Sequence, residues 1–373
     1  MSTDTDNGFY NWQRTFAYDA PVNIIVSWRG RGKTYGLRKQ MFRDWLKFKS
    51  RFVNVSRTVQ ESKAVCNNFF EKLVFNREPE VWDSVLDRPK FEFKVSKDCL
   101  YIRPHEPELK KNPYPWEVMG YFVALNSRQL AKQMTYVNVY RIVFDEAVLI
   151  KKDRFHKYLD DECAALSNVI NSCTREAGDL NKGNRRKPRL YLLGNSCDLL
   201  NPYFIQYGVY REPTEGYRWY NGKTVLVHYE VPDEETSNRL MNETLSGILG
   251  KGTSEEDSAF FSKFDDYAQD MIAKKPREAY PAQLWVYNNK KYTIWYVLDS
   301  DMIYVYSGAP KDGRKLPTYA LTTADNRVDY YYARTSVQAM KAFMRLFYGN
   351  HVRYESVLVM QEFLHALEVF GVH

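Results

Sequence analysis

The feature that most constrains the fold is a glycine-containing loop between an apolar run and an amphipathic segment. Residues 22–26 predict a buried strand, residues 34–46 predict a helix, and the loop 27–34 between them reads SWRGRGKT. The apolar face of the helix is expected to carry Leu37, Met41, Trp45 and Leu46. In a loop of the pattern GxxxxGK[ST], main-chain N–H groups surround phosphate oxygens, the lysine reaches the β- and γ-phosphates, and the hydroxyl binds Mg²⁺. The loop therefore predicts a site for ATP and Mg²⁺.

One departure leaves the loop motif ambiguous by itself. Ser27 stands where the pattern has its first glycine, so a surface turn that merely contains Gly-Lys-Thr also fits. A second motif separates the two interpretations. Residues 142–146 end an apolar run in two acids, so Asp145 can join the Mg²⁺ shell and Glu146 can polarise the attacking water. Together the motifs predict ATP hydrolysis, and we expect the strand that carries the acids to lie next to the P-loop strand. The loop residues assigned to the nucleotide are Gly30, Gly32, Lys33 and Thr34.

The remaining pattern of the first half alternates strands with helices. Residues 52–55, 140–144 and 190–193 predict strands, residues 91–102 predict a hairpin, and residues 162–174 predict a helix. This alternation is typical of an α/β domain with a mainly parallel sheet.

Length and charge predict the domain organisation. At 373 residues the chain is long for a single core. Residues 1–230 carry 37 Lys and Arg against 27 Asp and Glu, whereas residues 231–262 carry 2 against 7 and residues 263–373 carry 14 against 12. We expect an ATPase domain at 1–230, an acidic, turn-rich linker domain at 231–262 and a third domain at 263–373. The basic first part is compatible with a polyanionic partner and equally with an ordinary basic surface.

The last domain reads as an α+β module. Strands are expected at 284–287, 292–298 and 303–306, and helices at 336–347 and 355–369. A two-metal nuclease needs several converging carboxylates, yet the leading strand runs into residues 288–290, Asn-Asn-Lys, without an acid. Asp299 and Asp301 flank a turn, where acids are favoured for conformational reasons. We predict a nucleic-acid-binding or partner-binding domain without nuclease activity.

Cysteine usage and hydropathy predict the compartment. The cysteines are widely spaced without a CxxC pair, and the six histidines show no zinc-like spacing, which predicts reduced thiols in a cytosolic protein. They are Cys66, Cys99, Cys163, Cys173 and Cys197. The sequence has no run of eighteen apolar residues, and its first eight residues are polar and acidic, so we expect neither a membrane segment nor a signal peptide.

Two polar residues each allow two interpretations. Asn195 follows the strand predicted at 190–193, where its amide can contact the γ-phosphate or the attacking water, or can cap a turn. Arg175 ends a predicted helix, where it can interact with the helix dipole or act as an arginine finger for a neighbouring subunit. The residues alone leave both questions open.

The motifs together resemble a known family. Residues 27–34, 142–146 and 195, followed by Asn-Pro-Tyr-Phe at 201–204, resemble the phi29-like phage DNA packaging ATPases. Phe-Tyr-Asn at 9–11 and Ala-Leu-Thr-Thr at 320–323 match the same pattern, so the resemblance spans nearly the whole chain. It implies a P-loop ATPase domain of the additional-strand, catalytic-Glu type, a small linker domain, and a C-terminal domain that resembles a degenerate RNase H fold.

The same resemblance implies partners and a location. Such proteins form rings, typically homo-pentamers, on the portal, or connector, of an empty capsid and drive double-stranded DNA inward with ATP. A structural RNA can be part of such a motor, and no membrane is involved. The implied location is the host cell cytoplasm and, transiently, the portal vertex.

Site residues carry over position by position. The resemblance agrees with the roles given above to Lys33, Thr34, Asp145 and Glu146. It implies a sensor at Asn195 and a trans-acting arginine finger at Arg175, and it gives Arg57 a basic position without a defined role. It adds three nucleotide-binding positions, Tyr10, Arg29 and Arg31.

Two basic runs are candidates for contact with DNA. Lys151, Lys152 and Arg154 follow the catalytic strand. In ring motors of this architecture that segment lies near the central pore, where cations meet backbone phosphates, although a solvated loop fits the same residues. The second run is longer than the family pattern and is either a solvated loop or a contact to DNA or a neighbouring subunit. It contains Lys182, Arg185, Arg186, Lys187 and Arg189.

Two other functions compete with packaging. One is a helicase or chromosome-partition translocase that works without a capsid, and the other is a nucleotide-dependent scaffold that binds DNA without moving it. Lys33, Asp145 and Glu146 argue against a scaffold, because a scaffold has no need of a water-activating glutamate.

Overall fold

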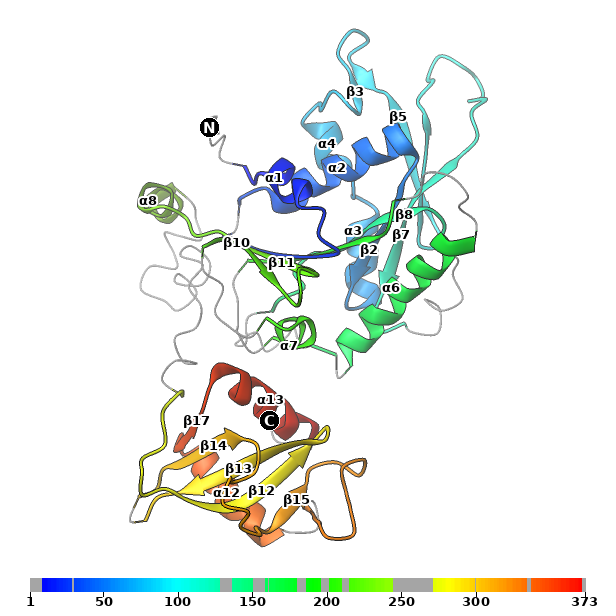
Figure 1. Cartoon of the computed structure of the whole chain (residues 1–373). Helices are drawn as coiled ribbons and strands as arrows, with labels where there is room; N and C mark the ends of the chain where they lie inside the picture. Colours follow the sequence, from blue (N-terminus) through cyan, green and yellow to red (C-terminus); the bar gives the residue numbers. More distant parts are fainter. Residues whose placement is uncertain are drawn as a thin grey trace. The chain divides into compact units, whose positions relative to one another are not determined.

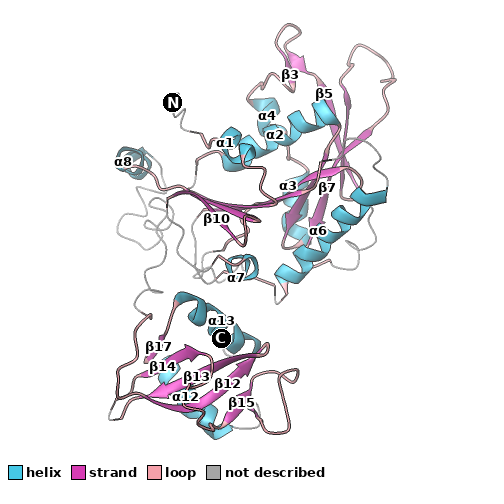
Figure 2. Ribbon diagram, in the orientation of Figure 1, coloured by secondary structure: helices cyan, strands magenta, loops and turns pink. Residues whose placement is uncertain are grey.

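The structure is a computed structural model that describes residues 9–28, 30–127, 136–149, 158–159, 161–179, 186–195, 201–209, 215–243, 271–298, 300–333 and 337–370. The chain divides into two compact units, one formed by Met1–Tyr207 with Pro213–Phe264 and the other by Gly208–Glu212 with Asp265–His373. Each unit contains its own sheet (Figures 1 and 2). Of the predicted linker domain at 231–262, the structure describes only residues up to 243, including helix α8 (Glu234–Glu243), so a separate linker remains a prediction.

Within the described residues, the first unit is built on a nine-stranded sheet. In order across the sheet, the strands are β10 (Gly216–Tyr220), β11 (Val225–Tyr229), β1 (Val22–Val26), β9 (Arg189–Gly194), β8 (Val139–Phe144), β2 (Arg51–Ser56), β7 (Glu117–Ala124), β6 (Cys99–Pro104) and β5 (Phe91–Ser96). Neighbours pair in parallel from β11 to β7, and antiparallel strands extend both edges. The predicted parallel core is therefore confirmed. A separate short hairpin joins β3 (Trp82–Asp83) and β4 (Arg88–Pro89).

Helices cover both faces of this sheet (Figure 1). Helices α1 (Trp12–Ala17) and α2 (Lys33–Phe48) pack on one face, and α6 (Glu162–Asp179) and α7 (Pro202–Tyr207) lie on the other. Two shorter helices, α3 (Val59–Cys66) and α4 (Glu71–Phe75), follow β2 along the chain.

The helix after the P-loop forms as its apolar spacing predicts. Leu37, Met41 and Trp45 are buried in a core cluster with residues of the central strands. The prediction that Leu46 lies on the same face is wrong, because this residue is 40% exposed. At about 100° per residue, Leu46 is rotated by about 180° from Leu37 and therefore lies outside the buried stripe of the helix.

The order of the strands corrects one further expectation. The strand with the two acids, β8, does not lie next to the P-loop strand β1, since β9 lies between them. The sequence patterns also missed β7, β10 and β11, which contribute to the same sheet. Hydrophobic runs indicate that strands exist, but strand order depends on contacts between distant segments.

The second unit, in its described part, contains a six-stranded sheet with two helices. In order, the strands are β16 (Tyr331–Tyr332), β15 (Thr318–Ala320), β12 (Tyr280–Tyr287), β13 (Lys290–Tyr296), β14 (Ile303–Ser307) and β17 (Val352–Tyr354). Strands β12, β13 and β14 were predicted, as were helices α12 (Val337–Tyr348) and α13 (Val357–Phe370). The ring of Trp285, which is fully buried, contacts Phe343 of α12 and Phe363 of α13. Both helices therefore pack on the same face of the sheet.

Cysteines and hydropathy can be checked only where the chain is described. Four of the five cysteines lie in that part, and all four are free thiols. Burial raises the pKa of Cys163 and of Cys173 to about 12, so both thiols are protonated and unreactive at neutral pH. No described helix is both long and apolar enough to cross a bilayer.

Candidate nucleotide site

The candidate site lies where four neighbouring parallel strands end. In the order β1, β9, β8 and β2, Val26 is the partner of Gly194, Phe144 of Leu192, and Val55 of Phe144. The residues that follow these strands therefore meet at one edge of the sheet. They are Ser27, Asn195, Asp145 and Arg57. Ligands of open α/β sheets bind at this carboxyl edge.

The P-loop has the backbone that a phosphate cradle requires. Gly30 and Gly32 have φ angles of +85° and +75°, a region in which a side chain would be strained. A Cβ atom at Gly32 would also lie 2.6 Å from the ring of Phe9. Ser27, by contrast, does not have a positive φ, so the serine in place of the first glycine imposes no strain. Arg29, which we assigned to the nucleotide, lies outside the described residues.

The lysine of the loop is held at its centre. The Lys33 ammonium donates to the main-chain oxygens of Ser27 at 2.8 Å and Trp28 at 3.0 Å, and to Ser27 Oγ at 3.0 Å. It also donates to Asn195 Oδ1 at 3.1 Å. The structure thus brings the Asn195 amide next to the lysine of the loop, and its contact with a γ-phosphate stays a prediction.

The residues assigned to the metal also meet. Thr34 Oγ1 donates to Asp145 Oδ2 at 2.8 Å, although the two residues are 111 positions apart. A hydroxyl and a carboxylate side by side are hard oxygen donors of the kind that Mg²⁺ accepts, usually together with nucleotide phosphates and water. The chemistry of this donor pair therefore fits a magnesium ion.

Glu146 has an unusual backbone. Its φ is +52°, which is uncommon for a residue other than glycine, and its N–H donates to Asp145 Oδ1 at 3.1 Å. Its side chain is exposed. Such a conformation costs on the order of 1–3 kcal/mol and persists only when the surroundings hold it. The groups that hold this residue are therefore part of the site.

Arg57 supplies that support. Its guanidinium donates through Nη1 to the carbonyl of Glu146 at 2.8 Å and through Nη2 to the carbonyl of Ala147. It lies 4.9 Å from the ring centroid of Phe144 and 5.2 Å from that of Tyr158, and only 5% of the residue is exposed. The rigid fork of an arginine is suited to hold two adjacent carbonyls.

A buried carboxylate balances the charge of Arg57. Arg57 Nε donates to Glu162 Oε2 at 3.0 Å, and Glu162 is 1% exposed at the start of α6. Glu162 also accepts from the Leu159 N–H at 3.1 Å and from the Tyr203 hydroxyl. The sequence reasoning missed Glu162 and left Arg57 without a role. The only available signal was that Arg57 follows a buried strand.

Two residues assigned to the nucleotide turn out to support the loop. The Arg31 side chain pairs with Glu230 just after β11, with Nη2–Oε1 at 2.8 Å and Nε–Oε2 at 3.2 Å. The Tyr10 N–H donates to the Arg31 carbonyl at 2.8 Å, but the ring of Tyr10 is buried. Both residues thus contact the protein itself, and their assignment to the nucleotide stays a prediction.

The hydroxyl of Tyr10 is also used internally. It contacts Thr15 Oγ1 at 2.8 Å and His228 Nδ1 at 2.6 Å. Burial lowers the pKa of His228 to about 4, so its imidazole is neutral at pH 7 and can accept the hydrogen bond from Tyr10. This polar cluster fixes the segment that precedes the P-loop.

Several predicted residues have no described side chain. Arg175 lies in α6, which continues to Asp179 and so does not end at Arg175 as predicted; nothing is described of its side chain. Lys151, Lys152 and Arg154 lie outside the described residues. Their roles stay predictions.

Comparison with known proteins identifies relatives of the whole chain. The chain matches the model of the Podovirus DNA encapsidation protein (Gp16) family over residues 5–359. It is 24% identical over 317 residues to the DNA packaging protein of Bacillus phage phi29, which covers 85% of this chain and 83% of that protein. To the DNA packaging protein of Bacillus phage B103 it is 24% identical over 309 residues, covering 83% and 84%.

Solved structures share the fold. The bacteriophage Phi-29 viral genome packaging motor assembly matches with a TM-score of 0.65 at 21% identity, covering 97% of this chain and 99% of that one. The Phi-28 gp11 DNA packaging motor matches with a TM-score of 0.67 at 19% identity, covering 98% of each chain. The resemblance inferred from the motifs is confirmed, and because the family match spans nearly the whole sequence, the chain belongs to the Podovirus DNA encapsidation protein (Gp16) family.

Proposed function

We propose that this DNA packaging ATPase hydrolyses ATP with Mg²⁺ as a homo-pentameric ring on the portal of an empty capsid, and so drives double-stranded DNA inward. The observation that carries the proposal is the meeting of Lys33, Thr34, Asp145 and Asn195 at one edge of a parallel sheet. Family membership favours packaging over a capsid-free translocase or a scaffold. The ring would work in the host cytoplasm and, transiently, at the portal vertex, with a structural RNA as a further candidate component.

The contacts indicate how these residues would act. Lys33, now bonded to Ser27 and Trp28, would transfer its donors to phosphate oxygens. Thr34 and Asp145 would hold the Mg²⁺, which neutralises phosphate charge when bound. Glu146 would orient and polarise the attacking water, and Asn195 would sense the γ-phosphate through the amide that already lies at Lys33.

The strand order supports the finer fold assignment. Insertion of β9 between β1 and β8 is the arrangement expected of an additional-strand P-loop ATPase. In the second unit, three antiparallel strands, β12 to β14, are joined by parallel strands at the sheet edges, which supports a fold related to RNase H.

Carboxylates of the second unit support a domain without nuclease activity. Asp325 accepts from the N–H groups of Asn288 and Asn289 and from Thr322 Oγ1. Glu362 accepts from Lys290 and Tyr292. These acids are occupied by the domain's own donors.

A packaging assay tests the proposal. The chain, portal-bearing empty capsids, DNA and ATP are mixed, and the DNA that becomes resistant to added nuclease is measured. We expect protection that requires both the capsid and ATP, and a Lys33→Ala variant should give none because it lacks the phosphate-binding ammonium. ATP-driven movement of DNA that proceeds equally without capsids would instead support the helicase or partition translocase.

The predicted pore segment can be tested in the same assay. If Lys151, Lys152 and Arg154 contact DNA phosphates, changing all three to alanine should reduce packaging and lower the salt slope of DNA binding by up to about three units. ATP binding by the isolated subunit should be unchanged, since none of the three belongs to the P-loop. Normal packaging with an unchanged salt slope would place the DNA contact elsewhere.

Arg57 yields a further prediction. Arg57→Ala should destabilise the protein by about 3–5 kcal/mol, because Glu162 would remain buried without its partner. The double variant Arg57→Met/Glu162→Gln should recover much of this loss, measured by urea unfolding, since no unpaired charge is left. Its kcat should nevertheless stay low, because the carbonyl of Glu146 still lacks its donor. If kcat recovers together with stability, Arg57 has no positioning role.

A further inference from the structure

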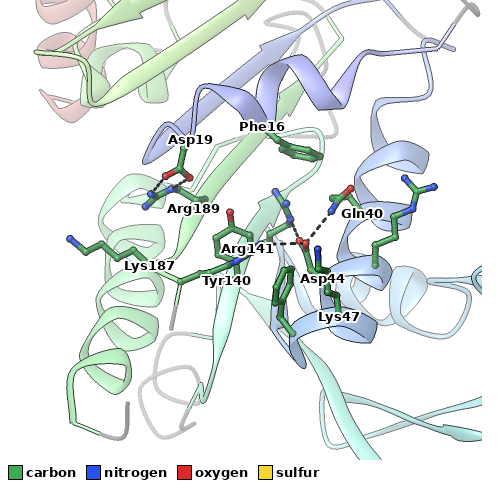
Figure 3. A pocket seen from close by; sticks show the side chains of 12 residues that line it. Phe16, Asp19, Gln40, Asp44, Lys47, Tyr140, Arg141, Lys187 and Arg189 are labelled. Atoms are coloured by element: carbon green, nitrogen blue, oxygen red, sulfur yellow. Dashed lines mark hydrogen bonds and ion pairs between the residues drawn. The ribbon is translucent and has the colours of Figure 1, made fainter. Parts of the chain in front are cut away.

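A cationic pocket lies at the opposite end of the same strands (Figure 3). Its volume is about 740 Å³. It lies near the amino ends of β8 and β9 and the last turns of α2, whereas the nucleotide site follows the carboxyl ends of the strands. A ligand in this pocket would therefore not compete with ATP.

The pocket carries an excess of positive charge. Among its described lining residues, the cations are Arg43, Lys47, Arg141, Arg186, Lys187 and Arg189, and the carboxylates are Asp19 and Asp44. Arg43 also pairs with Glu80, which does not line the pocket. Even with Glu80 included, positive charges exceed negative ones by three, so the pocket is complementary to an anion.

Two ion pairs give the pocket a fixed framework. In the first pair, which is buried, Arg141 Nε donates to Asp44 Oδ2 at 2.5 Å (Figure 3). In the second, Arg189 donates to both carboxylate oxygens of Asp19, at 2.9 and 2.7 Å. Arg141 and Arg189 are partners in the register of β8 and β9, so their backbones lie side by side. The two arginines are thus held in place by strands and not by a loop.

Other cations are only weakly neutralised. The Arg186 guanidinium lies 3.7 Å from the ring centroid of Phe48, and its nearest carboxylate contact, to Asp44 Oδ1, is long at 3.7 Å. Within the described part of the chain, neither Lys47 nor Lys187 forms an ion pair with a carboxylate. Lys47 lies in the last turn of α2, where the helix dipole favours a positive charge. This dipole does not explain the cations that come from β8, from β9 and from the residues before β9.

We propose that this pocket binds phosphate groups of a nucleic-acid backbone. Arginine forks and lysines match phosphate oxygens, and such contacts position a nucleic acid without reading its sequence. The ring of Phe48 is already covered by Arg186, which favours contact with the backbone over stacking of bases. The proposal rests on the proposed function in one respect, namely that such a motor acts on a nucleic acid, which is a polyanion. Duplex DNA and duplex RNA both carry the backbone phosphates that the pocket would bind.

The test is a matched pair of double variants of the full chain. Lys47→Ala/Lys187→Ala removes two pocket cations that support no ion pair in the described part of the fold. Lys63→Ala/Lys72→Ala removes the same charge from exposed positions in α3 and α4 that do not line the pocket. Binding of fluorescent duplex DNA and, separately, duplex RNA is measured by anisotropy over a range of salt concentrations, and thermal unfolding checks that both variants fold.

The pocket variant should bind a duplex severalfold more weakly, with a salt slope lower by up to about two units, and the control should change little. Basal ATP turnover should be unchanged in both variants. A loss confined to RNA or to DNA identifies the ligand, and a loss with both identifies a general backbone site. Equal losses in the two variants, or no loss with either duplex, would overturn the pocket proposal while leaving capsid-dependent packaging by the unmodified chain unaffected.

Discussion

Glu146→Gln is expected to lower kcat for ATP hydrolysis by about 10²- to 10⁴-fold while ATP affinity stays near that of the unmodified chain. The amide has the shape of the carboxylate but cannot polarise the attacking water, and this contribution exists only in the transition state. Support of the backbone should persist, because Arg57 binds the carbonyl of residue 146 and not its side chain. Steady-state phosphate release and titration with a fluorescent ATP analogue measure the two quantities.

The matched control for this variant is Glu71→Gln, at an exposed position in α4. It removes the same charge from the same unit, and should leave turnover unchanged. Turnover that is undiminished in Glu146→Gln would remove Glu146 from the mechanism.

Arg175→Ala is expected to reduce turnover of the assembled ring by about 10³-fold or more, which is the usual contribution of an arginine finger. A finger donated across an interface is absent from the subunit's own site, so the nucleotide affinity of the isolated subunit should hardly change. Turnover is measured under conditions in which sizing shows that the ring is intact. A variant that retains normal turnover in such rings would exclude the finger.

Mixing the two variants tests whether Arg175 acts in trans. In rings that contain both Arg175→Ala and Glu146→Gln subunits, some interfaces combine an intact Arg175 with an intact Glu146. Activity should partly return at intermediate ratios, although neither variant is active alone. Rings shown to be mixed that never recover activity would contradict a simple exchange of arginine across the interface.

The central site was predictable because its parts are local patterns. The P-loop motif consists of consecutive residues, and each strand before a polar terminus is a short apolar run. The carboxyl ends of parallel strands meet at one edge, so Lys33 and Asp145 could be assigned to a common site before their contacts were known, whereas the residues alone left the role of Asn195 open. The α/β class followed from the alternation of strands and helices.

The ion pairs around the site were not predictable in the same way. Arg57 and Glu162 are 105 positions apart, and Arg31 and Glu230 are 199 apart. Nothing in the local sequence distinguishes either pair from ordinary surface charges. The burial that makes each pair important exists only after the sheet and its helices have assembled.

The sequence by itself therefore determined the P-loop, the two acids that follow β8, the parallel α/β class and the family. The tertiary structure decided that β9 separates β1 from β8, that Arg31 and Tyr10 support the loop, and that Arg57 holds the backbone of Glu146. It also gathered cations from α2, β8 and β9 into one pocket. The physical reason is the range of the interactions, since periodicity and loop motifs act over neighbouring residues, whereas strand order, buried ion pairs and pockets arise from residues that meet only in the folded chain.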